Sequence, residues 1–407
     1  MTDPVQASVA YDWEHRRKWF YSPFPVEEYK RRTKALADWC KANGYDTALV
    51  HSSTGSRGEL RYLANWDNFI GGDSVMIIPA SGAEPTLVTN SIFHGEPMHA
   101  GAFTTWVPNM LAADHPGTVT HQVSLAGLIA KVLIDCGLAK ARAALVGKAM
   151  PAVLRDELAA ALPAFTFQPA DGMFSQLKSV KSECEIEVLR KVARIGAKGL
   201  LAGYHAAKPG VTEKTVAGAV YGAMMEAGAD EIPGPPAIVA GPRAGFKHVF
   251  PTDRRMALGD MVCLDIAALY GGYFADVARG FVVGDDPDDR LRHMLDTSLS
   301  MSEEVLKRIK AGVPISWVMD AAKEVAVEAG FGHLYHAKGF GHGIGTNKAE
   351  LPKFAEGVPD TLKANMVFCL EPMLVETGVG TAVVEDMIRV TEEGYEILSE
   401  GCPRRLW

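Results

Sequence analysis

Two aspartates in the C-terminal half of the chain have a spacing that brings their side chains to one site. Asp265 and Asp276 lie in the segment MVCLDIAALYGGYFADVARGFVVG, which reads as two strands joined at a Tyr270-Gly271-Gly272 turn. The aspartates stand an odd number of positions apart across a two-residue loop, so both point to the same face of the hairpin. Two carboxylates on one buried, apolar face repel each other and lose hydration unless a cation lies between them. The spacing therefore indicates a metal site.

Three further residues extend this ligand set. His342 lies in the glycine-rich stretch GFGHGIG, while Glu371 and Glu385 each interrupt an apolar strand. An ion-paired or capping role explains any one strand acid on its own, but four acids in apolar strands favour a common site. Four carboxylates and one imidazole suit a pair of Mn, Co, Fe or Zn ions better than a single structural zinc.

The order Asp, Asp, His, Glu, Glu resembles that of the pita-bread superfamily of creatinase, prolidase, Xaa-Pro aminopeptidase and methionine aminopeptidase. The stretches that carry the resemblance are LDIAALYGGYFADVAR, GFGHGIGTNKAELP, FCLEPM and VVEDMIRVTEEG. The resemblance implies that two divalent metal ions are bound by Asp265, Asp276, His342, Glu371 and Glu385. It also implies a creatinase-type α/β N-terminal domain followed by an α+β pita-bread metallohydrolase domain.

The same resemblance implies roles for residues around the ligands. Glu371 is expected to accept the proton of the attacking water, and His248 in GFKHVFPTDRR to protonate the departing nitrogen. Arg279 is expected to orient a ligand carboxylate by a forked hydrogen bond, and Glu350 to act as an outer acceptor. His336 is a candidate for supporting the metal-site histidine, with a hydrogen-bonded loop residue as an equal alternative.

Three positions depart from the Xaa-Pro peptidase pattern. Ala349 stands where these peptidases usually carry a second histidine, Val383 where they carry an arginine, and Ala278 where they carry a threonine. The missing histidine removes a donor to an oxyanion or a peptide carbonyl, a contribution of roughly 3 kcal/mol. None of the three is an expected metal ligand. The pattern predicts a metal-competent site with an altered substrate pocket.

The predicted function is a metal-dependent hydrolase that cleaves an amide-like C–N bond in an Xaa-Pro peptide or another small polar substrate. One alternative is a small-molecule specialist that resembles creatinase, ectoine hydrolase or the dimethylsulfoniopropionate lyase of the same fold. Another is a non-catalytic binding scaffold, since some pita-bread proteins have lost their ligands. The complete five-residue ligand set argues against the scaffold.

The elements that position these residues fall into two predicted domains, because 407 residues are too many for one compact core. Residues 1–173 alternate helix and strand signals, including an amphipathic helix at 25–43, and predict an α/β domain. Residues 174–407 form the predicted catalytic domain. A Ser182–Glu185 capping box opens its first helix.

The catalytic domain also contains an internal repeat. Lys208–Ala229 aligns with Lys310–Phe331 at a constant offset of 102 residues, as Gly210 against Gly312 and Gly228 against Gly330 show. Each copy precedes a strand region that carries candidate metal ligands. The repeat predicts a pseudo-two-fold duplicated domain with the site between its halves.

Bulk properties restrict the partners and the compartment. The net charge of −8 offers no electrostatic reason to expect nucleic acid or an anionic membrane as a partner. Six cysteines are scattered without CxxC spacing, which fits a reducing compartment. No N-terminal signal segment and no apolar run of about 18 residues is present. These features predict a soluble, cytoplasmic protein, and we expect it to form a homodimer.

Overall fold

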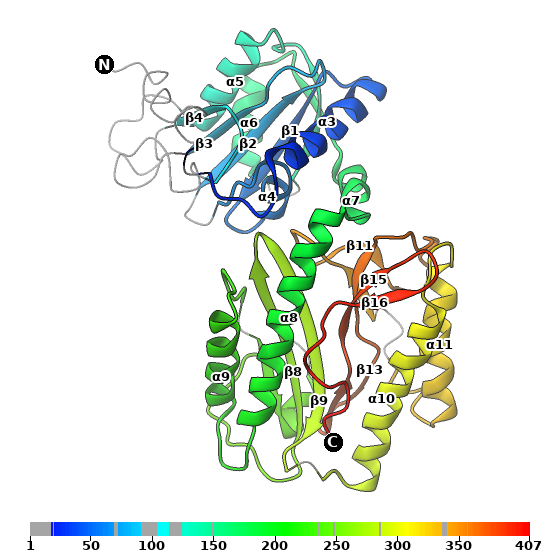
Figure 1. The fold of residues 1–407 in the computed structure, drawn as a ribbon. Helices are drawn as coiled ribbons and strands as arrows, with labels where there is room; N and C mark the ends of the chain where they lie inside the picture. Colours follow the sequence, from blue (N-terminus) through cyan, green and yellow to red (C-terminus); the bar gives the residue numbers. More distant parts are fainter. Residues whose placement is uncertain are drawn as a thin grey trace. The chain divides into compact units, whose positions relative to one another are not determined.

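The structure is a computed structural model (Figure 1). It describes residues 18, 20–68, 72–90, 104–113, 124–147, 150–234, 236–246, 249–284, 286–335, 340–355 and 357–407. The chain divides into two compact units, Met1–Ser175 and Gln176–Trp407. This division lies close to the boundary between residues 173 and 174 expected from the sequence.

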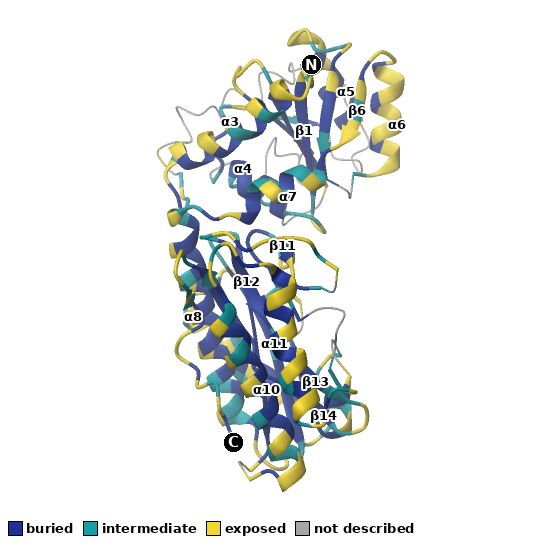
Figure 2. Ribbon diagram, turned by 90° about the vertical axis from the view of Figure 1, so that its right-hand side faces the viewer, coloured by how far each residue is buried: buried dark blue, intermediate teal, exposed yellow. Residues whose placement is uncertain are grey.

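The first unit is built on a six-stranded mixed sheet with the order β4-β3-β2-β1-β5-β6. Its strands are β1 (Thr47–Ser53), β2 (Asp73–Pro79), β3 (Thr86–Asn90), β4 (Asn109–Ala113), β5 (Arg142–Val146) and β6 (Thr166–Pro169). Its helices are α3 (Val26–Ala42), α4 (Gly58–Ala64), α5 (Leu125–Asp135) and α6 (Ala152–Ala161). Figure 2 shows α3 and α6 on opposite sides of this sheet. The α/β character predicted for this part of the chain is confirmed.

Local sequence signals explain the helix limits in this unit. Helix α3 buries Tyr29, Leu36 and Cys40, which lie on one face at helical spacing. Asn43 caps the C-terminus of the helix, and Gly44 follows with a positive φ of 70°. Helix α5 begins after Ser124, whose side chain accepts a hydrogen bond from the backbone N–H of Gly127.

The second unit contains two helix pairs and a set of antiparallel strands. The helices are α8 (Glu183–Ala206), α9 (Glu213–Glu226), α10 (Asp289–Arg308) and α11 (Ile315–Glu328), preceded by α7 (Asp171–Ser179), which crosses the division between the units. The strands are β7 (Ala237–Ala240), β8 (Met261–Tyr270), β9 (Tyr273–Val282), β10 (Gly341–Gly343), β11 (Glu350–Lys353), β12 (Val367–Leu370), β13 (Met373–Glu376), β14 (Gly380–Val383), β15 (Asp386–Val390) and β16 (Tyr395–Ile397).

These strands form three sheets. Their orders are β7-β8-β9, β11-β10-β12-β15-β16 and β13-β14. An isolated antiparallel bridge between Arg279 and Val384 joins β9 to the segment between β14 and β15. None of the described helices combines the length and the apolar character that crossing a bilayer requires.

The predicted capping box is present at the start of α8. The Ser182 side chain accepts from the Glu185 backbone N–H, and the Glu185 carboxylate accepts from the Ser182 backbone N–H. The other Glu185 oxygen accepts a 2.9 Å hydrogen bond from the Tyr273 hydroxyl. The cap therefore also ties the helix to β9, one of the strands that carries a candidate ligand.

The two repeat copies adopt the same local structure. Helices α9 and α11 begin and end at positions that match under the 102-residue offset, as 213 against 315 and 226 against 328 show. Gly228 and Gly330 both have positive φ, at 99° and 82°, where glycine is favoured. Their N–H groups close equivalent turns, to Met225 and Val327 respectively.

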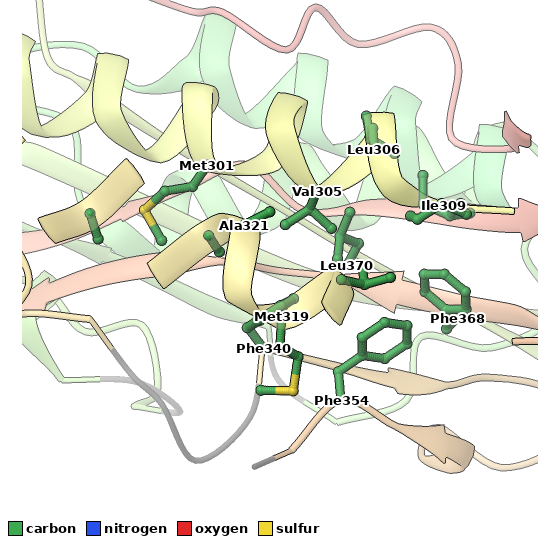
Figure 3. Packing of buried hydrophobic residues seen from close by; sticks show 14 of the residues in the cluster. Met301, Val305, Leu306, Ile309, Met319, Ala321, Phe340, Phe354, Phe368 and Leu370 are labelled. Atoms are coloured by element: carbon green, nitrogen blue, oxygen red, sulfur yellow. The ribbon is translucent and has the colours of Figure 1, made fainter. Parts of the chain in front are cut away.

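A buried aromatic and aliphatic layer supports the strands of the second sheet (Figure 3). Met301 and Val305 of α10 belong to the same core as Phe340, Phe354 and Phe368. The ring centroids of Phe354 and Phe368 lie 4.4 Å apart. This packing positions β10, which carries the candidate ligand His342, and β12, which is followed by the candidate ligand Glu371.

Candidate metal centre

The hairpin β8–β9 presents two candidate ligands on one face. The loop is Gly271-Gly272, with φ of 57° and 80°, the positive values that a tight two-residue hairpin turn requires. The register pairs Asp265 with Ala278 and Asp276 with Ala267. The two aspartates are therefore diagonal neighbours on the same face, as their spacing predicts. Asp276 is buried and Asp265 is half-buried.

The other candidate ligands lie in or next to adjacent strands. His342 in β10 pairs with Cys369 in β12, and Glu371 follows the last residue of β12. Glu385 precedes β15, which pairs with β12. The Glu385 backbone N–H donates a 2.9 Å hydrogen bond to the carbonyl of Ala278 in β9. This bond joins the second sheet to the aspartate hairpin.

Asp276 lies at the centre of the cluster. Single ligand atoms of Asp276, Glu385 and Cys369 all lie within 4.8 Å of one another. His342 Nε2 is 3.6 Å from Asp276 Oδ2. Asp265 and Glu371 act electrostatically on Asp276, which joins them to the same site. The five residues predicted as ligands are therefore brought together.

The electrostatics of this cluster call for a cation. Burial first, and then repulsion from Asp265 and Glu371, raises the pKa of Asp276 well above its ordinary value. Burial, and then repulsion from Asp276 and Glu371, likewise raises the pKa of Glu385. Among the described residues, Asp276 Oδ1 is buried without a hydrogen-bond partner. A buried carboxylate with an unpaired oxygen is costly, so the donor set fits oxygen-preferring divalent ions.

Cys369 is a member of this cluster that the sequence reasoning missed. Its thiol lies 3.5 Å from the backbone carbonyl oxygen of Asp276, to which it donates. Burial, reinforced by the neighbouring carboxylates, raises the pKa of this thiol well above its ordinary value, so it stays protonated at neutral pH. A protonated thiol is a poor metal ligand. Side chains alternate along a strand, so residue 369 lies on the same side as Glu371, and this alternation could have revealed its position.

Arg279 does not form the expected forked hydrogen bond to a ligand carboxylate. Its guanidinium donates to the backbone carbonyl of Glu385 and, at 2.7 Å, to the side chain of Asp386. It also donates to the carbonyl of Pro403. Arg279 thus positions Glu385 through the backbone, because β9 and the strand after Glu385 lie side by side.

Glu350 forms a buried ion triad with two lysines. Lys178 Nζ and Lys181 Nζ lie 2.7 and 2.8 Å from its two carboxylate oxygens. Burial opposes ionisation, but the two lysines prevail and lower the pKa of Glu350 to about 2. Glu350 is expected from the sequence to act as an outer acceptor near the site. In the structure its ion pairs anchor the loop before β11.

The remaining predicted positions have different outcomes. His248 and His336 lie outside the described residues. Ala349 is exposed, whereas Ala278 and Val383 are buried in one small apolar cluster with Val239, Ala244, Cys263 and Met373. Two of the three departures from the peptidase pattern are therefore packed together beside the hairpin.

A cavity of about 170 Å³ opens beside Asp265. Its lining is Pro233, Pro236, Ala237, Val249, Phe250, Asp265, Ala267 and Lys348. Lys348 Nζ also lies 3.2 Å from Asp276 Oδ2, a contact that sequence reasoning missed. Burial lowers the pKa of this amine, but Asp276, Asp265 and Glu385 outweigh that effect and raise it. No local pattern in GTNKAELP marks this lysine as a site residue.

Comparison with known proteins agrees with this geometry. The model of metallopeptidase family M24 matches residues 187–392. A peptidase of Staphylococcus saprophyticus without an assigned function is 31% identical over 243 residues, which are 60% of this chain and 69% of that protein. The Xaa-Pro dipeptidase of Pyrococcus furiosus is 29% identical over 234 residues, 58% of this chain and 67% of that protein.

Solved structures show the same fold over almost the whole chain. Dipeptidase PepE from Mycobacterium ulcerans has a TM-score of 0.78 at 26% identity, covering 94% of this chain and 98% of its own. The X-Pro aminopeptidase of Thermotoga maritima has a TM-score of 0.80 at 24% identity, with 92% and 99% covered. The predicted pita-bread fold with an α/β N-terminal domain is confirmed. The chain therefore belongs to metallopeptidase family M24, a family of hydrolytic enzymes.

Proposed function

We propose that this protein uses two divalent metal ions to hydrolyse an amide-like C–N bond in a short peptide or another small polar substrate. The observation that carries the proposal is the buried pair of Asp276 and Glu385, with Oδ1 of Asp276 left without a hydrogen-bond partner among the described residues. Two acids that repel each other at such a depth are stable as ions only beside cations. Asp265, His342 and Glu371 complete the proposed ligand set.

The chemistry supplied by two bound divalent ions is that of Lewis acids, which polarise a carbonyl group and lower the pKa of water. Glu371 is the proposed base that accepts the proton of that water. Its side chain is half-buried, so it can face both the buried acids and an incoming substrate. His248 is the proposed acid for the departing nitrogen, because an imidazole titrates near neutral pH. His342 holds its place through Nδ1, which lies 3.0 Å from the Gly343 carbonyl.

The pocket favours a compact substrate. The cavity of about 170 Å³ has an apolar lining except for Asp265 and Lys348. Val249 lines this cavity and packs against the cluster that contains Ala278 and Val383. Apolar residues at these two positions support the second candidate function, a small-molecule specialist of the same fold that hydrolyses or eliminates from a substrate other than an Xaa-Pro peptide.

We further propose Mn, Co, Fe or Zn as the metals and a cytoplasmic homodimer as the working form. The mixed carboxylate and imidazole donors accept any of these ions. All six cysteines are free in the described structure, which supports a reducing compartment.

Metal removal tests the proposed function. Purified protein is stripped with a chelator, reloaded separately with Mn²⁺, Co²⁺, Fe²⁺ or Zn²⁺, and assayed with Xaa-Pro dipeptides and small amides. We expect activity to disappear on stripping and to return with two ions bound per chain, measured by elemental analysis. Full activity in the stripped protein would contradict the proposal. The reloaded protein is also incubated with small cationic osmolytes, and release of a volatile product in place of a free amine would favour the specialist that eliminates.

A further inference from the structure

The loop between β10 and β11 is fixed by hydrogen bonds of its backbone. The Ile344 N–H donates to Val367, and the Gly345 carbonyl accepts a 2.9 Å hydrogen bond from Phe274 in β9. The Asn347 N–H donates at 3.0 Å to the Glu350 carboxylate. The loop is therefore held to two strands and to the first residue of β11.

Glu350 anchors this loop to two buried lysines. Its side chain is 3% exposed, and its partners Lys178 and Lys181 are 3% and 0% exposed. Gly345 permits the close approach, because a Cβ at this position would lie 2.5 Å from Glu350 Oε2. The triad and the glycine together fix the loop without a direct contribution to the metal cluster.

Lys348 extends from this fixed loop to the metal cluster. Its Nζ lies 3.2 Å from Asp276 Oδ2, and its side chain is 45% exposed, so a molecule in the cavity can reach it. Among the described residues that line the cavity beside Asp265, Lys348 is the one with a positive charge. It adjoins Ala349, where the peptidase pattern would place a histidine. A flexible four-carbon stem allows the ammonium to move a few ångströms without moving the loop.

Charge balance decides what this ammonium binds in the working enzyme. Asp265, Asp276, Glu371 and Glu385 together carry four negative charges when ionised, and two divalent ions neutralise all four. The attraction that holds Lys348 at Asp276 is then replaced by repulsion from the ions. The other residues that line the cavity are apolar apart from Asp265. The ammonium is therefore available to an anionic group of the substrate.

We propose that Lys348 binds the carboxylate of the substrate and makes this enzyme selective for small substrates with a free carboxylate. This inference rests on the proposed hydrolysis at the metal centre. A lysine ammonium and a carboxylate form a charge-assisted hydrogen bond, which is stronger than the bond to a neutral amide. Because Glu350 fixes the loop, the backbone of Lys348 stays at a constant distance from the site.

The test compares matched substrates on matched variants. Ala-Pro dipeptide and its C-terminal amide are assayed with the metal-loaded wild type, Lys348→Met, Lys348→Arg and the surface control Lys363→Met. We expect the wild type to prefer the free acid by about 10- to 100-fold in kcat/KM, mainly through KM. Lys348→Met should lose this preference because kcat/KM falls for the free acid and stays the same for the amide. Lys348→Arg and Lys363→Met should retain the preference. Metal content should be equal in all four proteins.

A binding measurement separates this proposal from the proposed function. Calorimetry with proline and with prolinamide on metal-loaded protein should show tighter binding of proline to the wild type and no preference in Lys348→Met. A metal-loaded wild type that hydrolyses no dipeptide but keeps this difference contradicts peptide hydrolysis and supports Lys348 as a carboxylate-binding residue. An unchanged preference in Lys348→Met, no preference in the wild type, or loss of metal in Lys348→Met would overturn the proposal.

Discussion

Asp276 and Glu385 approach each other from different sheets, with ligand atoms within 4.8 Å and both side chains almost fully buried. Asp276 stands on β9, whereas Glu385 precedes β15 and donates its backbone N–H to Ala278 of β9. This backbone hydrogen bond and the Arg279–Val384 bridge beside it hold two repelling carboxylates close together. The following predictions depend on this arrangement.

We expect Asp276→Asn and Glu385→Gln to abolish activity and to lower bound metal while the fold persists. Each change removes one charged donor, but helices α10 and α11 keep their own apolar core. Elemental analysis and circular dichroism measure the two effects, with the exposed Asp320→Asn as a matched control. Thermal stabilisation on metal addition should occur in the wild type and the control only. Equal metal-induced stabilisation in Asp276→Asn would remove this residue from the ligand set.

His248→Ala should reduce turnover by about 10²- to 10⁴-fold, the usual contribution of a general acid. Metal content should stay at the wild-type level, because this histidine is not an expected ligand. Single-turnover assays together with elemental analysis separate the two quantities. Loss of metal in this variant would show that His248 is a ligand.

Arg279→Lys should weaken metal binding by about 10- to 100-fold, since Arg279 positions Glu385 without touching the metal ligands' side-chain oxygens. A lysine cannot reach both the Glu385 carbonyl and the Asp386 carboxylate as a planar guanidinium does. Titration of stripped protein with Mn²⁺ measures the affinity. The control is Arg389→Lys, whose partner Glu183 is mainly exposed. Identical affinity in Arg279→Lys and wild type would rule out this positioning role.

Glu350→Gln should destabilise the folded protein by about 3 kcal/mol or more at pH 7, because it leaves two buried lysines without a countercharge. The folded pKa of Glu350 is lowered from 4.5 to about 2. Between these values the unfolded chain binds a proton that the folded chain does not, so this stabilisation is complete above pH 4.5 and is lost as the pH falls toward 2. Thermal unfolding of both proteins at pH 7 and pH 3 measures the difference, which should shrink at the lower pH. A constant difference would contradict the assigned ion triad.

Ala349→His tests whether the chain is a peptidase that has only lost a donor. We expect the larger side chain to lower the native activity and to bring no gain in any Xaa-Pro dipeptidase activity, because Ala278 and Val383, which share one apolar cluster, also depart from the peptidase pattern. Assays with Ala-Pro and with the native substrate class measure the two activities. A clear gain of dipeptidase activity would make proline peptides the leading substrates.

Much of the catalytic unit follows from local sequence alone. The Gly271-Gly272 turn and the alternation around Asp265 and Asp276 determine a hairpin with both acids on one face, since a strand has a period of two. Ser182 and Glu185 determine the start of α8 through hydrogen bonds that span only three residues. Such features need no knowledge of distant segments, because their partners are near in the chain.

Tertiary structure decided which groups these elements meet. Glu350 faces Lys178 and Lys181, about 170 positions away in sequence, and so anchors a loop where the sequence suggested an acceptor near the metals. Lys348 and Cys369 enter the cluster for the same reason, and Arg279 reaches the backbone of Glu385 across a strand bridge. Residue types and periodicity determine the direction of a side chain within its own element. The depth of burial and the charges around it depend on how separate elements pack, and these long-range contacts carry no local pattern.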